Sequence, residues 1–277
     1  MKNQIREYYS KPQGLVKSHS LAGIRESGDL STEGKQMPLL TEPSIKLPPN
    51  AVLDSILTTR SVVLADGTCS KLHSETSSEE CSAMYQFFKE NPPDIAIEIG
   101  MAYGVSSLAA LTALEENQRG RLISIDPYPP GFDQVRKSAL LSIERAGLSH
   151  RHSHLHMESE LALPKLIAEG IQPDFVYIDG HHGFDHAFVD FFFADKIIPV
   201  GGTIAFDDSQ WRSVHRVVQY LLNHRHYEEL NVGLQKSYAS ANLINNAYKR
   251  IQNRFGPSRY FRKTDDWKPE SNFYRNF

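Results

Sequence analysis

The chain has 277 residues, of which 40% are hydrophobic and 23% charged, and its formal net charge is −3. This length and composition are typical of a globular protein with one large domain. A net charge this small does not favour nucleic acid or an anionic membrane as a partner. No apolar run approaches the ~20 residues of a membrane span, and residues 1–14 lack the apolar middle of a signal peptide. With only two cysteines, Cys69 and Cys81, we expect reduced thiols in a cytoplasmic protein.

Residues 1–50 are rich in Ser, Pro, Gly and charge and show no sustained period. This composition predicts an extended N-terminal arm, either a flexible tail or a cap over a substrate. A short helix is expected over residues 51–57. A second helix is expected over residues 74–90, because Ser and Glu near its start suit a helix N-terminus and an apolar stripe follows.

Strands and helices then alternate. Short apolar runs that predict strands occupy residues 94–100, 121–126, 153–157, 174–180 and 201–208, and the segments that predict helices are 105–117, 132–147, 160–170, 184–199 and 213–225. This alternation predicts an α/β fold: a Rossmann-like, doubly wound, mainly parallel seven-stranded sheet with helices on both faces. Residues 227–233 and 237–244 could supply the two closing strands.

We therefore expect a domain over residues 51–246 and a C-terminal tail over residues 247–277. The tail interleaves basic and aromatic residues, a pattern that can bind nucleic acid. Because the whole chain is mildly acidic, packing on the sheet, on a second subunit or over an acceptor pocket is the better interpretation.

A glycine-containing loop follows the first strand of this series, in the segment EIGMAYGVSS. Gly100 and Gly104 let the backbone approach a ligand where a Cβ atom would clash. The spacing G-x-x-x-G differs from the G-x-G-x-x-G fingerprint that places a pyrophosphate on a helix N-terminus, which disfavours a NAD oxidoreductase. Asp126 ends the second strand about 20 residues later, where a carboxylate can accept hydrogen bonds from ribose hydroxyls. The pattern favours an adenosine ligand without phosphate.

Four segments in order, EIGMAYGVSS, SIDPYP, DFVYIDGHH and PVGGTIAFDD, resemble the successive motifs of class I S-adenosylmethionine (SAM) dependent methyltransferases. Within that class the chain resembles the macrocin-type sugar O-methyltransferases and, more distantly, the catechol and caffeoyl-CoA O-methyltransferases. The resemblance covers about residues 75–210 and implies SAM as the cofactor. The contacts it implies are Glu98, Gly100, Met101, Tyr103, Gly104, Ser106, Asp126, Ser159 and Asp179.

Acidic residues end the fourth and fifth strands of the series, at Asp179 and at Asp207 and Asp208. The carboxyl ends of parallel strands lie on one sheet edge, so these carboxylates should converge, and their oxygens suit Mg²⁺ or a similar divalent ion. The resemblance implies that the three residues bind the metal and that His182 is the general base, with Asp179 also catalytic. His181 is the competing base. Alternatively, the aspartates cap the following helix, or serve a methyltransferase without metal.

The sequence thus predicts metal-assisted O-methylation of a hydroxyl group on a small molecule, such as a sugar, a phenol or a natural-product scaffold. We expect no nucleic-acid or membrane partner, and homo-oligomers are possible. A metal-free N-methyltransferase and a non-catalytic SAM-binding module remain open alternatives. Four alternating histidines at positions 150, 152, 154 and 156 could share one strand face, but they lack a firm zinc-ligand spacing.

Overall fold

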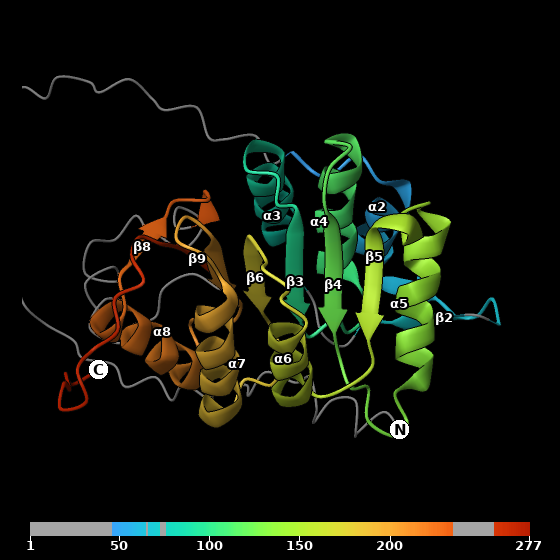
Figure 1. Cartoon of the computed structure of the whole chain (residues 1–277). Coiled ribbons are helices and arrows are strands. Elements are labelled where there is room, and N and C mark those ends of the chain that lie inside the picture. Colours follow the sequence, from blue (N-terminus) through green and yellow to red (C-terminus); the bar gives the residue numbers. More distant parts are fainter. Residues whose placement is uncertain (1–45, 65, 73–75, 235–257) are drawn as a thin grey trace, which may run out of the picture.

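The computed structural model describes residues 46–64, 66–72, 76–234 and 258–277. Its main sheet has seven strands in the spatial order β5-β4-β3-β6-β7-β9-β8 (Figure 1). The strands are β3 (Ile95–Ile99), β4 (Arg121–Ile125), β5 (His152–Leu155), β6 (Phe175–Ile178), β7 (Thr203–Phe206), β8 (Tyr227–Leu230) and β9 (Arg259–Lys263). Strands β3 to β7 pair in parallel, while β9 is antiparallel to both β7 and β8. The predicted fold class is confirmed.

The strand order reverses direction between β3 and β6. From β3 the chain winds outward through β4 to β5, then crosses back to β6 on the other side of β3 and winds outward again to β7. In open α/β sheets, ligands bind beyond the carboxyl ends of the strands at such a reversal. The topology therefore singles out the ends of β3 and β6 as the place to search for a site.

The closing strands differ in part from the expectation. Strand β8 lies in the expected segment, whereas residues 237–244 lie outside the described residues. The partner of β7 and β8 is β9, within the segment expected to be a tail. The basic residues at its two ends are buried and paired: Arg259 donates to the carboxylate of Glu229 at 2.7 Å, and Lys263 lies 2.6 Å from Asp266.

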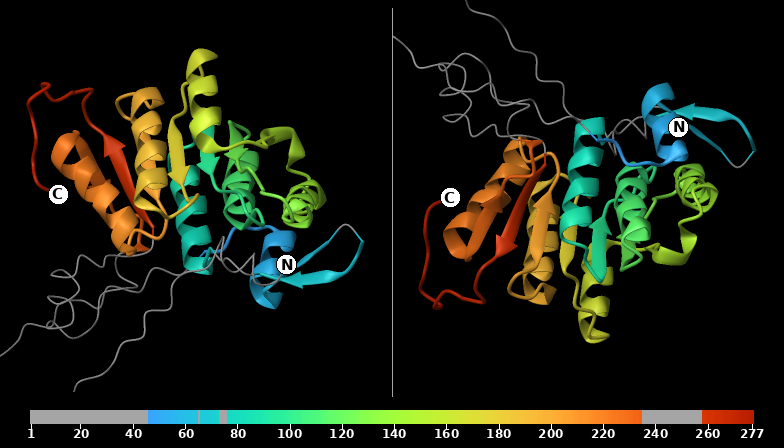
Figure 2. Two further views of the ribbon diagram at one scale, coloured as in Figure 1. Left: turned by 90° about the horizontal axis from the view of Figure 1, so that it is seen from below. Right: turned by 90° about the horizontal axis from the view of Figure 1, so that it is seen from above.

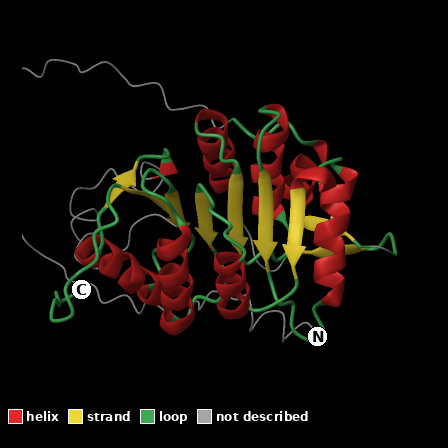
Figure 3. Ribbon diagram, viewed as in Figure 1, coloured by secondary structure: helices red, strands yellow, loops and turns green. Residues whose placement is uncertain are grey.

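Seven α-helices of the described chain cover the two faces of the sheet. One face carries α2 (Ala51–Thr59), α3 (Ser78–Glu90), α4 (Val105–Glu116) and α5 (Asp133–Arg145); the other carries α6 (Ser159–Ala168), α7 (Phe184–Ile197) and α8 (Arg212–His224) (Figures 2 and 3). A small antiparallel hairpin, β1 (Ser61–Val63) and β2 (Cys69–Lys71), lies beside α2 and α5. None of the described helices has the length and apolar character needed to cross a membrane.

The strand side chains alternate between two cores. Ala96 and Leu122 face the core shared with α3 and α4, whereas Ile97 and Ile123 face the core shared with α6, α7 and α8. Burial of apolar surface on both faces of a parallel sheet explains why these strands read as continuous hydrophobic runs. The central strands β3, β4, β6 and β7 are therefore buried on both faces.

Candidate active site

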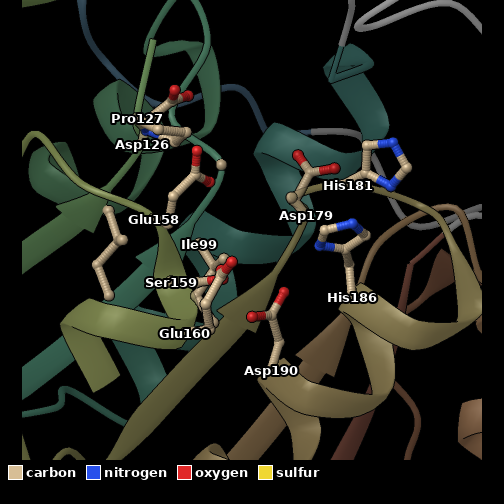
Figure 4. Close-up of a pocket in the computed structure, with 13 residues that line it drawn as sticks. Ile99, Asp126, Pro127, Glu158, Ser159, Glu160, Asp179, His181, His186 and Asp190 are labelled. Atoms are coloured by element: carbon tan, nitrogen blue, oxygen red, sulfur yellow. The ribbon is translucent and has the colours of Figure 1, made fainter. Parts of the chain in front are cut away.

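A cavity of about 240 Å³ opens at the carboxyl ends of β3, β4 and β6 (Figure 4). The position is the one that the strand reversal indicates. The residues that line it are Ile99, Gly100, Ile125, Asp126, Pro127, Glu158, Ser159, Glu160, Asp179, Gly180, His181, His186 and Asp190.

Five of the lining residues carry carboxyl groups, namely Asp126, Glu158, Glu160, Asp179 and Asp190, and none is Lys or Arg. Acidic walls raise the local concentration of cations and repel phosphate groups. The cavity therefore suits a cationic ligand and is poorly suited to a dinucleotide, in agreement with the absence of a pyrophosphate fingerprint.

The turn after β3 requires glycine at its first position. Gly100 has a φ of +89°, and a Cβ atom there would lie 2.1 Å from the carbonyl oxygen of Asp179. Gly104 has a φ of +75° and begins α4. The first glycine thus lets two strand ends touch through their backbones, while the second starts the helix in the left-handed region that glycine tolerates best.

Asp126 organises the same turn. Its Oδ2 atom accepts hydrogen bonds from the N–H groups of Met101 at 3.0 Å and Ala102 at 2.9 Å, and Oδ1 accepts one from Tyr128 at 2.9 Å. The Tyr128 hydroxyl donates to the Ala102 carbonyl at 2.6 Å. Burial raises the pKa of Asp126, and the backbone N–H donors lower it. The carboxylate that was predicted to bind ribose therefore also positions the loop, and ribose binding stays a prediction.

Glu98 is buried in β3, next to the lining residue Ile99. Its carboxylate accepts hydrogen bonds from the hydroxyls of Ser106 at 2.6 Å, Ser107 at 2.5 Å and Ser124 at 2.7 Å. Burial raises the pKa of Glu98, while the three serine donors lower it. This network joins β3, α4 and β4. Among the described residues that line the cavity, Glu98 and Ser106 are absent, so their direct contact with a cofactor also stays a prediction.

Of the other expected cofactor residues, some line the cavity and some do not. Met101, Tyr103 and Gly104 lie outside the set that lines the cavity, and the buried Tyr103 hydroxyl forms a hydrogen bond with Ser70 of the hairpin. Gly100, Asp126, Ser159 and Asp179 do line it.

His182 lies between two of the predicted metal ligands. Its Nε2 atom is 3.3 Å from Oδ2 of Asp208 and 3.5 Å from Oδ1 of Asp179. Neither contact has hydrogen-bond geometry, so this buried nitrogen has no hydrogen-bond partner among the described atoms. The His182 ring packs on Trp211 with centroids 4.8 Å apart. His181 instead lines the cavity beside His186, so the two adjacent histidines serve different parts of the site.

Asp207 belongs to a buried carboxyl cluster at the same edge. The Ser258 hydroxyl lies 2.7 Å from Oδ1 of Asp207 and 3.0 Å from Oε1 of Glu80. Burial and the nearby Asp207 charge raise the pKa of Glu80 to about 8. Burial, followed by repulsion from Asp207 and Asp208, raises the pKa of Asp179 well above its usual range. Sequence reasoning used Glu80 only as a helix-capping residue and missed its place in this cluster.

The three aspartates therefore converge as expected, but they do not form a finished metal centre. No group of three or more His, Cys, Asp or Glu side chains in the described ranges is arranged to hold a metal ion. A divalent cation would nevertheless offset the repulsion that raises the pKa of Asp179, and carboxylate oxygens are the donors that Mg²⁺ prefers. The carboxylate oxygens are suitable donors for a metal ion, but the three side chains are not arranged as its coordination shell.

Sequence reasoning missed two cavity residues that α6 and α7 contribute, Glu160 and Asp190. A signal existed for Asp190, because it is a carboxylate on a helix face that is otherwise aromatic and apolar. The alternating histidines lie at the β5 edge: His152 Nε2 is 3.0 Å from the Ser124 hydroxyl, and His154 Nε2 is 3.2 Å from the Asp126 carbonyl. Neither contact points to zinc.

Comparison with known proteins finds related sequences and structures. Residues 97–209 match the family model of a methyltransferase domain. Over this part of the sequence the chain is similar to a methyltransferase domain. It is 32% identical over 118 residues to a candidate caffeoyl-CoA O-methyltransferase of Arabidopsis thaliana, covering 42% of this chain and 46% of that protein. It is 30% identical over 118 residues to a flavonoid 3',5'-methyltransferase of Vitis vinifera, covering 42% and 47%.

The methyltransferase domain therefore aligns with about half the length of these curated relatives. Solved structures agree on the fold. The O-methyltransferase TomG of Streptomyces achromogenes, in complex with SAM, superposes with a TM-score of 0.56 at 17% identity, covering 80% of this chain and 93% of TomG. The methyltransferase PaMTH1 of Podospora anserina, bound to S-adenosylhomocysteine (SAH), gives 0.57 at 14% identity, covering 84% and 100%.

Proposed function

We propose that the protein transfers a methyl group from SAM to a hydroxyl oxygen of a small molecule. The observation that carries this proposal is the acidic cavity, whose lining includes Asp179, directly beside the ring of His182. SAM carries positive charge on its sulfonium and ammonium groups and has no phosphate, so it matches carboxylate walls without Lys or Arg. The relatives named above are O-methyltransferases or flavonoid methyltransferases, which supports oxygen as the acceptor atom.

The turn from Gly100 to Gly104 would hold the cofactor at the strand ends. Asp126 keeps the amides of Met101 and Ala102 fixed, so the turn needs no rearrangement when the ligand binds. Such preorganisation lowers the entropic cost of binding and keeps the methyl group aligned for transfer.

His182 is the proposed base. As the acceptor oxygen forms its bond to the methyl carbon, the carbon–sulfur bond breaks and the sulfonium becomes the neutral thioether of SAH. The hydroxyl proton passes to Nε2 of His182, a position that the described hydrogen-bond network leaves unpaired. The two nearby carboxylates, Asp179 and Asp208, would stabilise the imidazolium that results.

We further propose that Asp179, Asp207 and Asp208 hold a divalent metal, most simply Mg²⁺. When bound, such an ion would lower the pKa of an acceptor hydroxyl and orient it. The acceptor class follows from this chemistry: a small molecule with a hydroxyl beside a second oxygen, such as a sugar, a phenol or a natural-product scaffold.

One observation favours a second candidate. Because the described carboxylates form no finished metal site, a metal-free N-methyltransferase would use the same aspartates to bind a cationic amine. A non-catalytic SAM-binding module would have no use for a base between Asp179 and Asp208.

The deciding experiment has two stages. Calorimetry with SAM and SAH tests cofactor binding, with an expected Kd in the micromolar range. Mass spectrometry then follows the gain of one methyl group on a panel of vicinal diols, catechols and amines, with and without Mg²⁺. Methylation of amines alone would overturn the O-methyltransferase proposal, and absence of SAM binding would overturn the whole assignment.

A further inference from the structure

Asp190 is a buried carboxyl group that the proposed mechanism does not use. It lies on α7, is 2% exposed and lines the cavity. Its Oδ1 atom has no hydrogen-bond partner among the described atoms. A buried carboxyl oxygen left unpaired costs free energy, so a ligand that supplies a donor would recover it.

The surroundings of Asp190 define where that donor would come from. Its Oδ2 atom lies close to Gly180, where a Cβ atom would be 3.6 Å away. Burial raises the pKa of Asp190 to about 7, while the Ser159 hydroxyl and the charge of His186 lower it. The carboxyl group thus lies between the start of α6 and the second turn of α7, and Figure 4 shows it directed into the cavity.

The two ends of the cavity suit different parts of SAM. The methyl group must lie near His182, so the methionine portion belongs at the Asp179 end. The adenosine portion is then left for the end formed by Ser159, Glu160 and Asp190 (Figure 4).

Flat and apolar surfaces also line the cavity. Ile99, Ile125 and Pro127 line the cavity, and the rings of His181 and His186 have centroids 4.5 Å apart. Such surroundings suit a planar base, which has apolar faces and polar edges.

We propose that Oδ1 of Asp190 accepts a hydrogen bond from the exocyclic 6-amino group of the cofactor's adenine and so selects adenine over other purines. This inference rests on the proposed function and adds a specificity residue to it. A site built to receive an N–H group rejects an analogue that presents a carbonyl instead, because two acceptors then face each other.

The test compares SAH with S-inosylhomocysteine, in which the 6-amino group is replaced by a carbonyl. Calorimetry at pH 8, where the carboxyl group is mostly ionised, measures both Kd values. The native protein should bind SAH at least about 10-fold more tightly. In Asp190→Asn the ratio should fall below about threefold, because a carboxamide can present either an acceptor or a donor. Asp54→Asn, the same substitution at an exposed position on α2, is the matched control and should keep the native ratio.

Equal affinity of the native protein for both ligands would overturn the inference. So would an Asp190→Asn variant that weakens both ligands by the same factor, since that result indicates a structural role for Asp190. If the native protein binds neither ligand, the proposed function itself fails, and this outcome is distinct from the other two.

Discussion

Gly100 and Asp179 touch through their backbones: a Cβ atom on Gly100 would lie 2.1 Å from the Asp179 carbonyl oxygen. Separating the turn that follows β3 from the end of β6 would therefore break this contact, which lies in the wall of the cavity. This contact fixes the cofactor turn relative to the proposed catalytic residues, and it makes Gly100 the most sensitive glycine of the site.

We predict that Gly100→Ala destabilises the protein by at least about 3 kcal/mol, because it adds a steric clash to an unfavourable positive φ. Gly131→Ala is the matched control. Gly131 has a φ of +99°, but a Cβ atom on it would meet no other atom within 4 Å, so only the backbone strain of about 1–2 kcal/mol applies. Urea unfolding measures both. Similar losses in the two variants would mean that the contact with Asp179 contributes nothing.

The adjacent histidines should separate binding from turnover. His182→Ala should lower kcat by about 100-fold or more while SAM affinity changes little, as expected for loss of a general base. His181→Ala should instead raise the Kd for SAM several-fold, because His181 lines the cavity. Calorimetry and steady-state kinetics on both variants provide the check. A kcat loss confined to His181→Ala would reverse the assignment.

Metal removal tests the aspartate cluster. Excess EDTA should abolish methyl transfer and added Mg²⁺ should restore it, whereas SAM binding should persist. Asp207→Asn should weaken Mg²⁺ binding measured by calorimetry, because it removes one of three carboxylates. Glu144→Gln, on the exposed side of α5, is the control and should leave Mg²⁺ binding unchanged. Full activity in EDTA would favour the metal-free alternative.

The stability of the ligand-free protein should depend on Asp190 and on pH. Burial raises the pKa of Asp190 from 3.8 to about 7, so folding disfavours the ionised form. A raised folded-state pKa means that the native protein loses stability, relative to Asp190→Asn, as pH rises from about 4 to about 7. The loss can reach about 4 kcal/mol, since each pKa unit corresponds to about 1.4 kcal/mol. Urea unfolding at pH 4.5 and 7.5 measures it. A parallel pH dependence in both proteins would contradict the prediction.

The sequence predicted the strands and helices between residues 94 and 225 because their periodicities are strong and their boundaries carry glycines. Strand β9 was harder to predict. Its segment was expected to be a packed tail, and only the folded chain shows the carboxylates that pair with Arg259 and Lys263. The charge of a segment predicts its exposure to solvent only where no residue distant in the sequence pairs with it.

The site, too, was predictable only in part. Residues at strand ends, such as Asp126 and Asp179, follow from topology, because parallel strands bring their carboxyl ends to one edge. Asp190 and Glu160 lie on helices, where nothing in the spacing says which turn faces the cavity. The sequence also could not show that Glu98 accepts hydrogen bonds from three serines instead of lining the cavity.

Strand β9 is the last described strand in chain order, yet it lies between β7 and β8. During synthesis, β7 must therefore wait with an open edge until residues 259–263 emerge, and β8 has no neighbour in the sheet until then. Open strand edges invite pairing with other chains. Truncation before Arg259 would leave the edge of β7 open and β8 without its partner, and such a chain is expected to be prone to aggregation.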